Sequence, residues 1–275
     1  NPQPIYPMTL DILICSLNKG IVRIDDVIGA PRPDVRYIVS YQYTDERYLE
    51  LIPRAIIERS DVKLYQYKGQ GLSNNRNHAL ENATSDLVLF ADDDSRLSDG
   101  AFDTIFETFT QNEEVDVAFF RASTYTGKLL KNYPEKERLI TELPKDYSIS
   151  TIEMVCRRCK VQGNIRFDER FGLGTKFLTC REEDVWLVDA LRAGLHIKYF
   201  PLKIIETSTM LKRSMIYVDA GVQRSEGAFT YYLYGNAAYW RCFLFAFHCT
   251  RRGLTHFLPM FRHLLQGITY IKNNL

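Results

Sequence analysis

Three consecutive carboxylates are the first residues whose types and spacing suggest chemistry. Asp92, Asp93 and Asp94 directly follow the apolar run LVLFA, which has the composition of a buried strand. Carboxylates gathered at the exposed end of such a strand repel one another, and their oxygens suit Mg²⁺ or Mn²⁺ as ligands. The alternative is capping of the turn into the next helix, since Asp is common at such positions. The place at the end of a strand shifts the balance toward a metal site.

A second acidic group, Glu182, Glu183 and Asp184, lies at the start of a predicted helix. Acidic residues in a first helical turn stabilise the helix dipole by ~0.3 to 1 kcal/mol each, and this alone would explain their presence. Asp184, however, shares a helical face with the apolar Val188 and Leu191, so its carboxylate is predicted to point inward. An inward carboxylate beside a cleft is a candidate general base.

The surrounding elements must position these groups. The first half of the chain alternates short apolar runs with segments of helical periodicity, which predicts an α/β protein with a mostly parallel sheet. Ligands of such open sheets bind at the carboxyl ends of the strands, where the three aspartates stand. The predicted strands are 11–16, 35–40, 62–67 and 86–91. The predicted helices are 46–59 and 73–83, with Ser73 as the N-cap of the second.

The second half of the chain is more varied. Residues 124–150 are rich in charge and poor in periodic apolar positions, so we expect a mobile loop or a marginal hairpin there. A helix is predicted over 182–193, ended by Gly194, followed by an apolar strand over 196–200. The sequence contains no internal repeat and no low-complexity tract.

The last 49 residues differ in composition from the rest. From Gly227 to Leu275 there is no Asp or Glu, whereas Lys and Arg occur five times among many aromatic residues. This shift predicts a domain over 1–226 and a separate basic, aromatic and helical tail over 227–275. Helices that lie in a bilayer interface have such a composition, so we expect peripheral contact with a membrane surface. The alternatives are that the aromatic residues close over the first domain or form a homodimer contact.

Composition and cysteine spacing bound the class of protein. The 275 residues are 45% hydrophobic and 25% charged, as in a folded globular protein, and a formal net charge of +1 excludes nucleic acid as a charge-driven partner. Six scattered cysteines do not form a disulfide framework, and a zinc site at Cys156 and Cys159 lacks regularly spaced further ligands. Since no signal peptide or membrane-spanning run is present, we expect a cytoplasmic protein, peripheral on the inner face of the membrane.

The order of the motifs resembles a known family. The chain contains, in order, ILICSLN, IVSYQYTD, GQGLSNNRNHAL, LVLFADDD, FDERFGLG and EEDVWLVDALRAG. This order resembles the family 2 glycosyltransferases of the GT-A fold over roughly residues 9 to 207. The resemblance implies a GT-A fold, with a mixed and mostly parallel central sheet and flanking helices, followed here by the helical tail. It also implies an inverting transfer, with one direct displacement at the anomeric carbon of the sugar.

The resemblance gives both acidic groups a role. The family's D-x-D binds the ribose and the metal-bridged diphosphate of the donor, which implies these roles for Asp92 and Asp94, with Asp93 between them. Mn²⁺ or Mg²⁺ is then the expected cofactor. The family's E-D at a helix start supplies the base that deprotonates the acceptor hydroxyl. This implies Asp184 as the base and Glu183 as its neighbour.

Further donor-binding residues follow from the same resemblance. The family's S-x-x-R-N element corresponds to Ser73, Arg76 and Asn77, and a guanidinium suits a phosphate-rich site. At the end of the first strand the family usually has Thr and Tyr before Asn, whereas this chain has Ser16 and Leu17. Both are expected to contact the donor.

Two positions depart from the family in ways that concern the nucleotide base and the metal. After the second strand this chain has Ser40, Tyr41 and Gln42 where an Asp-Asp-Gly-Ser run is usual. Ser40 therefore replaces the aspartate that accepts the uracil N–H; Ser or Gln can still accept a hydrogen bond, and Tyr41 could stack on the base. After the later strand many relatives have a metal-binding histidine, whereas here Glu206 is a candidate ligand of the cation at Asp94.

We therefore expect a glycosyltransferase that moves a sugar from a nucleotide-diphosphate donor, a UDP-sugar in the simplest case, to a hydroxyl of a growing surface glycan or a lipid-linked acceptor. A cation at Asp94 offsets the charge of the leaving diphosphate while Asp184 takes the acceptor proton. Two alternatives remain. A nucleotidyltransferase that makes the activated sugar would need a Gly-rich basic loop, which SLNKGIVR is not. A non-catalytic glycan-binding protein with the same fold would release no nucleotide diphosphate.

Overall fold

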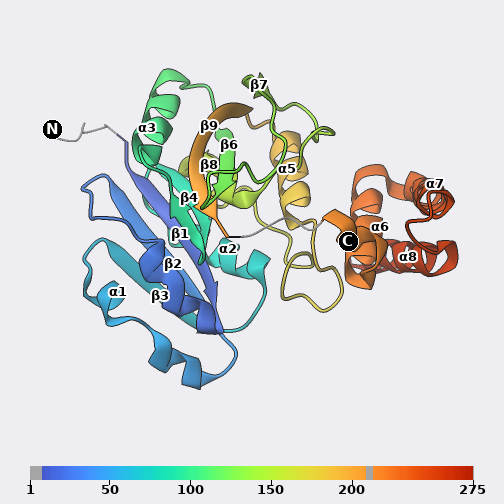
Figure 1. Cartoon of the computed structure of the whole chain (residues 1–275), viewed down its shortest axis with the longest axis horizontal. Coiled ribbons are helices and arrows are strands. Elements are labelled where there is room, and N and C mark those ends of the chain that lie inside the picture. The colour runs from blue at the N-terminus through green and yellow to red at the C-terminus, as the bar shows by residue number, and fades with distance from the viewer. Residues whose placement is uncertain (1–7, 209–212, 275) are drawn as a thin grey trace. The chain divides into compact units, whose positions relative to one another are not determined.

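A computed structural model of the chain describes residues 8–208 and 213–274. The chain divides into two compact units, which we describe separately (Figure 1). The sheet unit is formed by residues up to Gln70, by Asn74–Phe167 and by Trp186–Leu211. The helical unit is formed by Gly71–Ser73, Asp168–Val185 and Lys212–Leu275.

The described residues of the sheet unit form one nine-stranded sheet, ordered β3-β2-β1-β4-β8-β6-β9-β5, with the short β7 paired to β9. The strands are β1 (Leu10–Leu17), β2 (Val35–Tyr43), β3 (Val62–Lys68), β4 (Leu87–Asp92), β5 (Ser95–Leu97), β6 (Val117–Thr124), β7 (Arg138–Leu139), β8 (Met154–Arg157) and β9 (Ile197–Thr207). Strands β1 to β4 are mutually parallel, as are β6 and β9, whereas β5, β7 and β8 pair antiparallel with their neighbours. The predicted α/β class with a mixed, mostly parallel sheet is confirmed.

Helices and 3₁₀ turns connect the strands. They are η1 (Asn18–Asp26), η2 (Glu46–Leu51), α1 (Arg54–Glu58), α2 (Leu72–Glu81), α3 (Ala101–Gln111), η3 (Thr151–Glu153), α4 (Arg158–Val161), α5 (Glu182–Arg192), η4 (Arg213–Tyr217), α6 (Ala220–Tyr234), η5 (Gly235–Ala237), α7 (Ala238–Arg251) and α8 (Phe257–Asn273).

Two of the predicted helices differ from the observed ones. The single helix expected over 46–59 is wrong, because Pro53 separates η2 from α1; a proline ring restricts the preceding Ile52, which is extended here. Ser73 was expected as an N-cap, but α2 already includes Leu72, and the Ser73 hydroxyl donates a hydrogen bond to the Phe171 carbonyl at 2.7 Å instead. By contrast, α5 ends as predicted, with Gly194 at a φ of +78° beyond its last turn.

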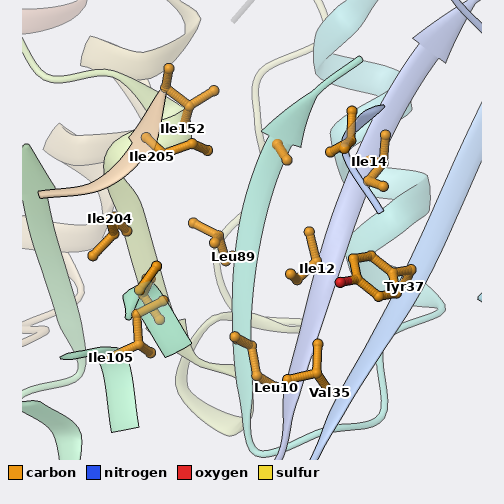
Figure 2. Close-up of a cluster of buried hydrophobic side chains, with 14 of the residues drawn as sticks. Leu10, Ile12, Ile14, Val35, Tyr37, Leu89, Ile105, Ile152, Ile204 and Ile205 are labelled. Carbon is orange, nitrogen blue, oxygen red and sulfur yellow. The ribbon is translucent and has the colours of Figure 1, made fainter. Parts of the chain in front are cut away.

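Alternate residues of neighbouring strands fill the main hydrophobic core of the sheet unit (Figure 2). Leu10 and Ile12 of β1 lie beside Leu89 of β4, and Ile204 of β9 and Ile105 of α3 belong to the same cluster. Each of these side chains is fully buried. This packing fixes the strands, and with them the loops at the carboxyl ends of β1, β2 and β4.

The segment 124–150 is irregular, as predicted, apart from the two residues of β7. It is nevertheless tied to the sheet unit by a buried ion pair, in which the Lys131 ammonium lies 2.9 Å from the Glu153 carboxylate. The Tyr133 hydroxyl donates to the same carboxylate at 2.5 Å, and Tyr133 stacks against Tyr199 of β9. The charged residues that indicated a mobile loop therefore include Lys131, a cation that anchors the segment.

In the helical unit α6, α7 and α8 pack together, and two glycines allow the closest approach. A Cβ added at Gly227 of α6 would lie 2.0 Å from the Leu264 carbonyl oxygen, and one at Gly267 of α8 would lie 1.9 Å from the Arg224 carbonyl oxygen. The two backbones are therefore in direct contact. The domain boundary predicted after Glu226 falls inside α6, so the structure divides the chain elsewhere.

None of the helices within 8–208 and 213–274 is both long enough and apolar enough to cross a membrane. The six cysteines, all in these ranges, are free thiols, and only Cys159 is exposed. Cys156 is fully buried in β8, and the described residues contain no group of three metal-ligating side chains, so the zinc alternative has no ligand set there.

Candidate active site

The three consecutive aspartates lie where β4 ends and turns into β5, and their side chains have different partners. Asp93 accepts a hydrogen bond from the Ser16 hydroxyl at 3.1 Å and pairs with the Arg23 guanidinium. Burial raises the pKa of Asp93, while the nearby Arg23 opposes that shift. Gly20 of η1 lies so close that a Cβ there would be 1.8 Å from Oδ2 of Asp93. Asp93 therefore joins β4 to η1, a role the sequence did not indicate.

The Asp94 carboxylate is hydrogen-bonded to residues at the C-terminal end of β9. Its Oδ2 accepts a hydrogen bond from the Ser208 hydroxyl at 2.5 Å, and its Oδ1 lies 3.4 Å from the Thr207 hydroxyl. Glu206, the neighbouring residue on β9, instead pairs with Lys203 at 2.7 Å. Adjacent strand residues point to opposite faces, so Thr207 and not Glu206 is aimed at Asp94. Sequence reasoning missed Thr207 and Ser208 because hydroxyls carry a weaker metal-site signal than carboxylates.

The described residues contain no preassembled cluster of three His, Cys, Asp or Glu side chains that could hold a metal, so Asp92, Asp94 and Glu206 do not form one. Mg²⁺ in nucleotide sites is usually held by only one or two carboxylates together with phosphate oxygens and water. Asp92 and Asp94 on one turn fit that incomplete type of site. Metal dependence therefore remains a prediction.

Arg76 of α2 brings a buried positive charge to the end of β4. Its guanidinium lies 4.0 Å from Asp92 and 5.3 Å from the ring centroid of Phe167, and its side chain is 5% exposed. A planar guanidinium held in this way suits a phosphate, so Arg76 stays the candidate phosphate ligand. Asn77 has a different role, because its side-chain amide accepts from the Phe167 N–H at 2.8 Å and donates to the Phe167 carbonyl at 2.9 Å. It anchors α2 to the backbone of Phe167.

Asn75 of α2 was not singled out from the sequence. Its Nδ2 donates a hydrogen bond to the Ser16 carbonyl at 3.1 Å, which ties α2 to the carboxyl end of β1. Its Oδ1 is buried without a hydrogen-bond partner. Leu17, the next residue of β1, is 39% exposed, so of the two predicted positions on this strand only Leu17 is accessible, whereas Ser16 is bonded to Asp93.

The residues expected to contact the nucleotide base are buried in β2. The Tyr41 ring is fully buried, and its hydroxyl donates to the Tyr48 carbonyl at 2.8 Å and to the Asn18 carbonyl at 3.1 Å. The Tyr41 ring is thus not accessible for stacking on a base in this structure, and its contact with the donor stays a prediction. Because successive side chains of a strand point to opposite faces, Tyr41 lies in the core, on the face opposite Ser40 and Gln42.

Ser40 and Gln42 belong to a chain of polar side chains on the α2 face of the sheet. The Ser40 hydroxyl lies 2.8 Å from Nδ1 of His78, and the Gln42 amide donates to the Tyr67 hydroxyl at 2.7 Å. Tyr67 in turn donates to Asn74 at 2.8 Å, and its ring lies 4.4 Å from that of His78. Burial lowers the pKa of His78, which favours the neutral imidazole. His78 packs within the protein and is in hydrogen-bond contact with Ser40, a predicted donor residue.

In the helical unit the first turn of α5 holds Asp184 in an ion-pair network. The Arg181 guanidinium lies 2.8 Å from Asp184 and donates through Nε to Glu226 of α6 at 3.0 Å. Burial raises the pKa of Asp184, and the charge of Arg181 counters that rise. Arg181 has a φ of +79°, uncommon for a residue with a side chain. This network holds the Asp184 side chain inward, which is the direction predicted from its helical face.

The other acidic residues of that turn differ from Asp184. Glu182 is buried beside Gly172, where an added Cβ would lie 2.9 Å from the Ser73 hydroxyl and 3.2 Å from the Glu182 carboxyl carbon. Glu183 is half-buried. The predicted donor residue Ser73 is therefore held by the Phe171–Gly172 backbone of its own unit.

Comparison with known proteins gives a consistent result. The model described as Glycosyl transferase family 2 matches residues 22–164. A crystal structure of S. aureus TarS 1-349 is similar, with a TM-score of 0.58 and 16% sequence identity, and covers 82% of this chain and 66% of that one. Crystal structures of TarS 1-349 with UDP-GlcNAc and with UDP have TM-scores of 0.53 and 0.52 at 14% identity, again over 82% of this chain and over 67% and 66% of theirs.

These likenesses show the fold, and the chain spans 66% of the first TarS structure's length and 40% of a longer TarS structure. None of the curated proteins matches the chain in sequence.

Proposed function

The chain belongs to glycosyl transferase family 2, and we propose that it moves a sugar from a UDP-sugar donor to a hydroxyl of a glycan or of a lipid-linked acceptor. One observation carries the proposal: Asp92 ends β4 and Asp94 stands on the turn that follows, with the buried Arg76 guanidinium 4.0 Å from Asp92. The guanidinium can neutralise a diphosphate directly, and the two carboxylates can do so through a divalent cation that they hold.

The donor end of the reaction uses residues of the sheet unit. Asp92 and Asp94 would hold a divalent cation together with the diphosphate, and a cation bound there offsets the charge that develops on the leaving group. Arg76 contributes a fixed positive charge to the same phosphates. Thr207 and Ser208 orient the Asp94 carboxylate through their hydroxyls.

The acceptor end uses Asp184. An acceptor hydroxyl oxygen attacks the anomeric carbon, the bond from that carbon to the diphosphate oxygen breaks, and its electron pair leaves with the nucleotide. Asp184 takes the hydroxyl proton, and the configuration at the anomeric carbon inverts. A carboxylate whose pKa is raised by burial is a better proton acceptor than an ordinary one, and Arg181 keeps it ionised and oriented.

The choice of uridine has separate support. TarS structures of similar fold were solved with UDP-GlcNAc and with UDP. In this chain Ser40 takes the place of the aspartate that accepts the uracil N–H in the family, and Ser40 and Gln42 each offer an oxygen that can accept the base N–H. Because both are buried among Tyr67 and His78, recognition of the base involves a rearrangement of these side chains.

The function is tested by incubating the full chain with UDP-GlcNAc and other nucleotide sugars in the presence of Mn²⁺ and measuring free UDP. Slow release of UDP to water is expected without acceptor, and none is expected from Arg76→Met or Asp94→Asn. A thermal-shift series with the same nucleotides reports binding independently of turnover. Nucleotide sugars that bind without any release of UDP would favour the non-catalytic glycan-binding alternative. Formation of a nucleotide sugar from a nucleoside triphosphate and a sugar phosphate would favour the nucleotidyltransferase.

A further inference from the structure

Helix α7 of the helical unit is apolar on its outer face as well as on its inner one. Its inner side chains, fully or almost fully buried, are Ala238, Cys242, Ala246 and Cys249. On the opposite face Trp240, Leu244 and Phe247 follow one another at i, i+4 and i+7, and they are 63%, 44% and 52% exposed. A surface helix ordinarily turns polar residues outward, and a helix that is apolar all round is normally covered.

The outer face continues across neighbouring rings. Phe243 stacks on Trp240 with ring centroids 5.4 Å apart and meets Phe261 of α8 edge-on at 5.7 Å. Phe261 also lines an apolar groove of about 700 Å³ along α8, together with Leu258 and Phe177. We call Trp240, Phe243, Leu244 and Phe247 the aromatic ridge. Phe261 is therefore in contact with the ridge and is also part of the wall of the groove.

The fixed charges that α7 and the residue after it carry are all positive. Arg251 follows Phe247 one turn later on the same stripe, and Arg252 is its neighbour; both are exposed. Arg241 stands 3.7 Å from the ring centroid of Tyr234, at the flank of the ridge. The sequence from Gly227 to the end contains no Asp or Glu that could neutralise them.

This combination decides what covers the ridge. A second copy of the chain docked through the same face would bring two sets of these arginines into one interface, which is unfavourable because their charges have the same sign. An anionic bilayer offers phosphates to the arginines and an acyl boundary to the aromatic rings. We propose that the aromatic ridge docks the helical unit on an anionic membrane surface, with α7 lying in the plane of the interface. This inference does not depend on the proposed sugar transfer.

Flotation of the full chain with phospholipid vesicles tests the proposal. The protein is expected to float with vesicles of phosphatidylcholine and phosphatidylglycerol at low salt, and to be released by raised salt or by omission of the anionic lipid. The double variant Trp240→Ser with Phe247→Ser should bind the vesicles at least about tenfold more weakly than the unaltered chain. Arg251→Glu with Arg252→Glu should lose binding and its salt dependence together. The tail is not simply deleted after Glu226, since that cut would divide α6.

A matched control replaces two equally exposed apolar residues elsewhere. Ile57 and Leu139 of the sheet unit are 63% and 65% exposed, so Ile57→Ser with Leu139→Ser should float like the unaltered chain. Thermal unfolding and UDP release, measured on every variant, separate lost docking from lost folding or lost activity. Equal flotation of ridge and control variants overturns the proposal. So does a chain that ignores vesicles and sediments as a dimer which the ridge variant dissociates, because a second copy then covers the ridge.

Discussion

At the scale of single residues, Asp184 is the group on which the proposed chemistry depends. Replacing Asp184 by Asn keeps the shape of the side chain and removes its ability to take a proton. We predict that Asp184→Asn lowers kcat by ~10² or more while the fold and the affinity for donor persist. Steady-state kinetics, a thermal-shift titration with UDP-sugar and circular dichroism check the three parts of this prediction. Glu183→Gln is the control, and an inactive Glu183→Gln beside an active Asp184→Asn would move the base by one position.

The ion pair with Arg181 predicts the pH dependence of the reaction. The base must be ionised, so activity is lost as pH falls through the pKa of Asp184, which burial places above that of an ordinary carboxyl group. Arg181 favours the ionised form, and Arg181→Met should therefore raise this pKa further and move the acidic limb of the kcat/KM profile to higher pH. Arg192→Met, at the exposed end of α5, should leave the limb in place. If the acidic limb of the kcat/KM profile is unchanged in Arg181→Met, the group that titrates there is not Asp184.

The metal prediction concerns Asp94. EDTA should abolish turnover, and Asp94→Asn should weaken donor binding when Mn²⁺ is present but have little effect when it is absent. Isothermal titration with UDP, with and without Mn²⁺, measures the difference. Asp99→Asn, an exposed carboxylate a few residues further on, serves as the control. Full activity in EDTA would remove the metal from the proposal.

The sequence predicted the acidic residues of the candidate site better than their partners. Asp94 and Asp184 were found because carboxylates at a strand end or inside a helix face need a reason to be there. Arg23, Thr207 and Arg181 were missed, since each meets its aspartate only through the fold or through an unusual backbone angle. The burial of Tyr41 was not foreseen, because a motif position says which residue follows a strand, not on which face of a longer strand its side chain lies.

At the scale of elements, the close crossing of α6 and α8 requires glycine, which has no side chain, at the point of contact. Gly227→Ala would place a methyl group 2.0 Å from a backbone oxygen of α8, so the helices must separate. We predict a loss of ~1 to 3 kcal/mol in the stability of the helical unit, measured by thermal or urea unfolding. At Gly69, where a Cβ would meet Tyr67 at an ordinary 3.5 Å, the change to Ala should cost little. Equal stability of both variants would contradict the close crossing.

Prediction of elements succeeded where apolar runs were long and failed at their ends. The four predicted strands of the first half are β1 to β4, each extended by one to three residues at one end or both, or shifted by one residue. The strand expected over 196–200 begins at Ile197 and continues to Thr207, because pairing with β6 resumes at Lys203 after an irregularity in the register. Pro53 could have been used to divide η2 from α1, since proline is a strong local signal.

At the scale of the whole molecule, composition located a distinct unit but not its limits. The loss of acidic residues after Glu226 coincides with the helices that form most of the helical unit, yet α6 starts at Ala220. Residues Asp168–Val185 also belong to that unit. Their membership arises from contacts such as Arg224 over the Phe177 ring at 4.5 Å, which join positions far apart in sequence. No local pattern records such a pairing.

The distribution of thiols has a practical consequence for the whole chain. Burial raises the pKa of Cys15 and of Cys242 to about 12 and that of Cys180 to about 11, which suppresses their reactive thiolates. Cys159 of α4 is exposed, so a maleimide should label one thiol per native chain and all six after denaturation, as counted by mass spectrometry. Cys159→Ser should abolish the fast reaction, and a second fast thiol would contradict the burial. The unaltered protein can thus carry a single fluorophore or spin label on its sheet unit, which gives distance measurements a fixed reference point.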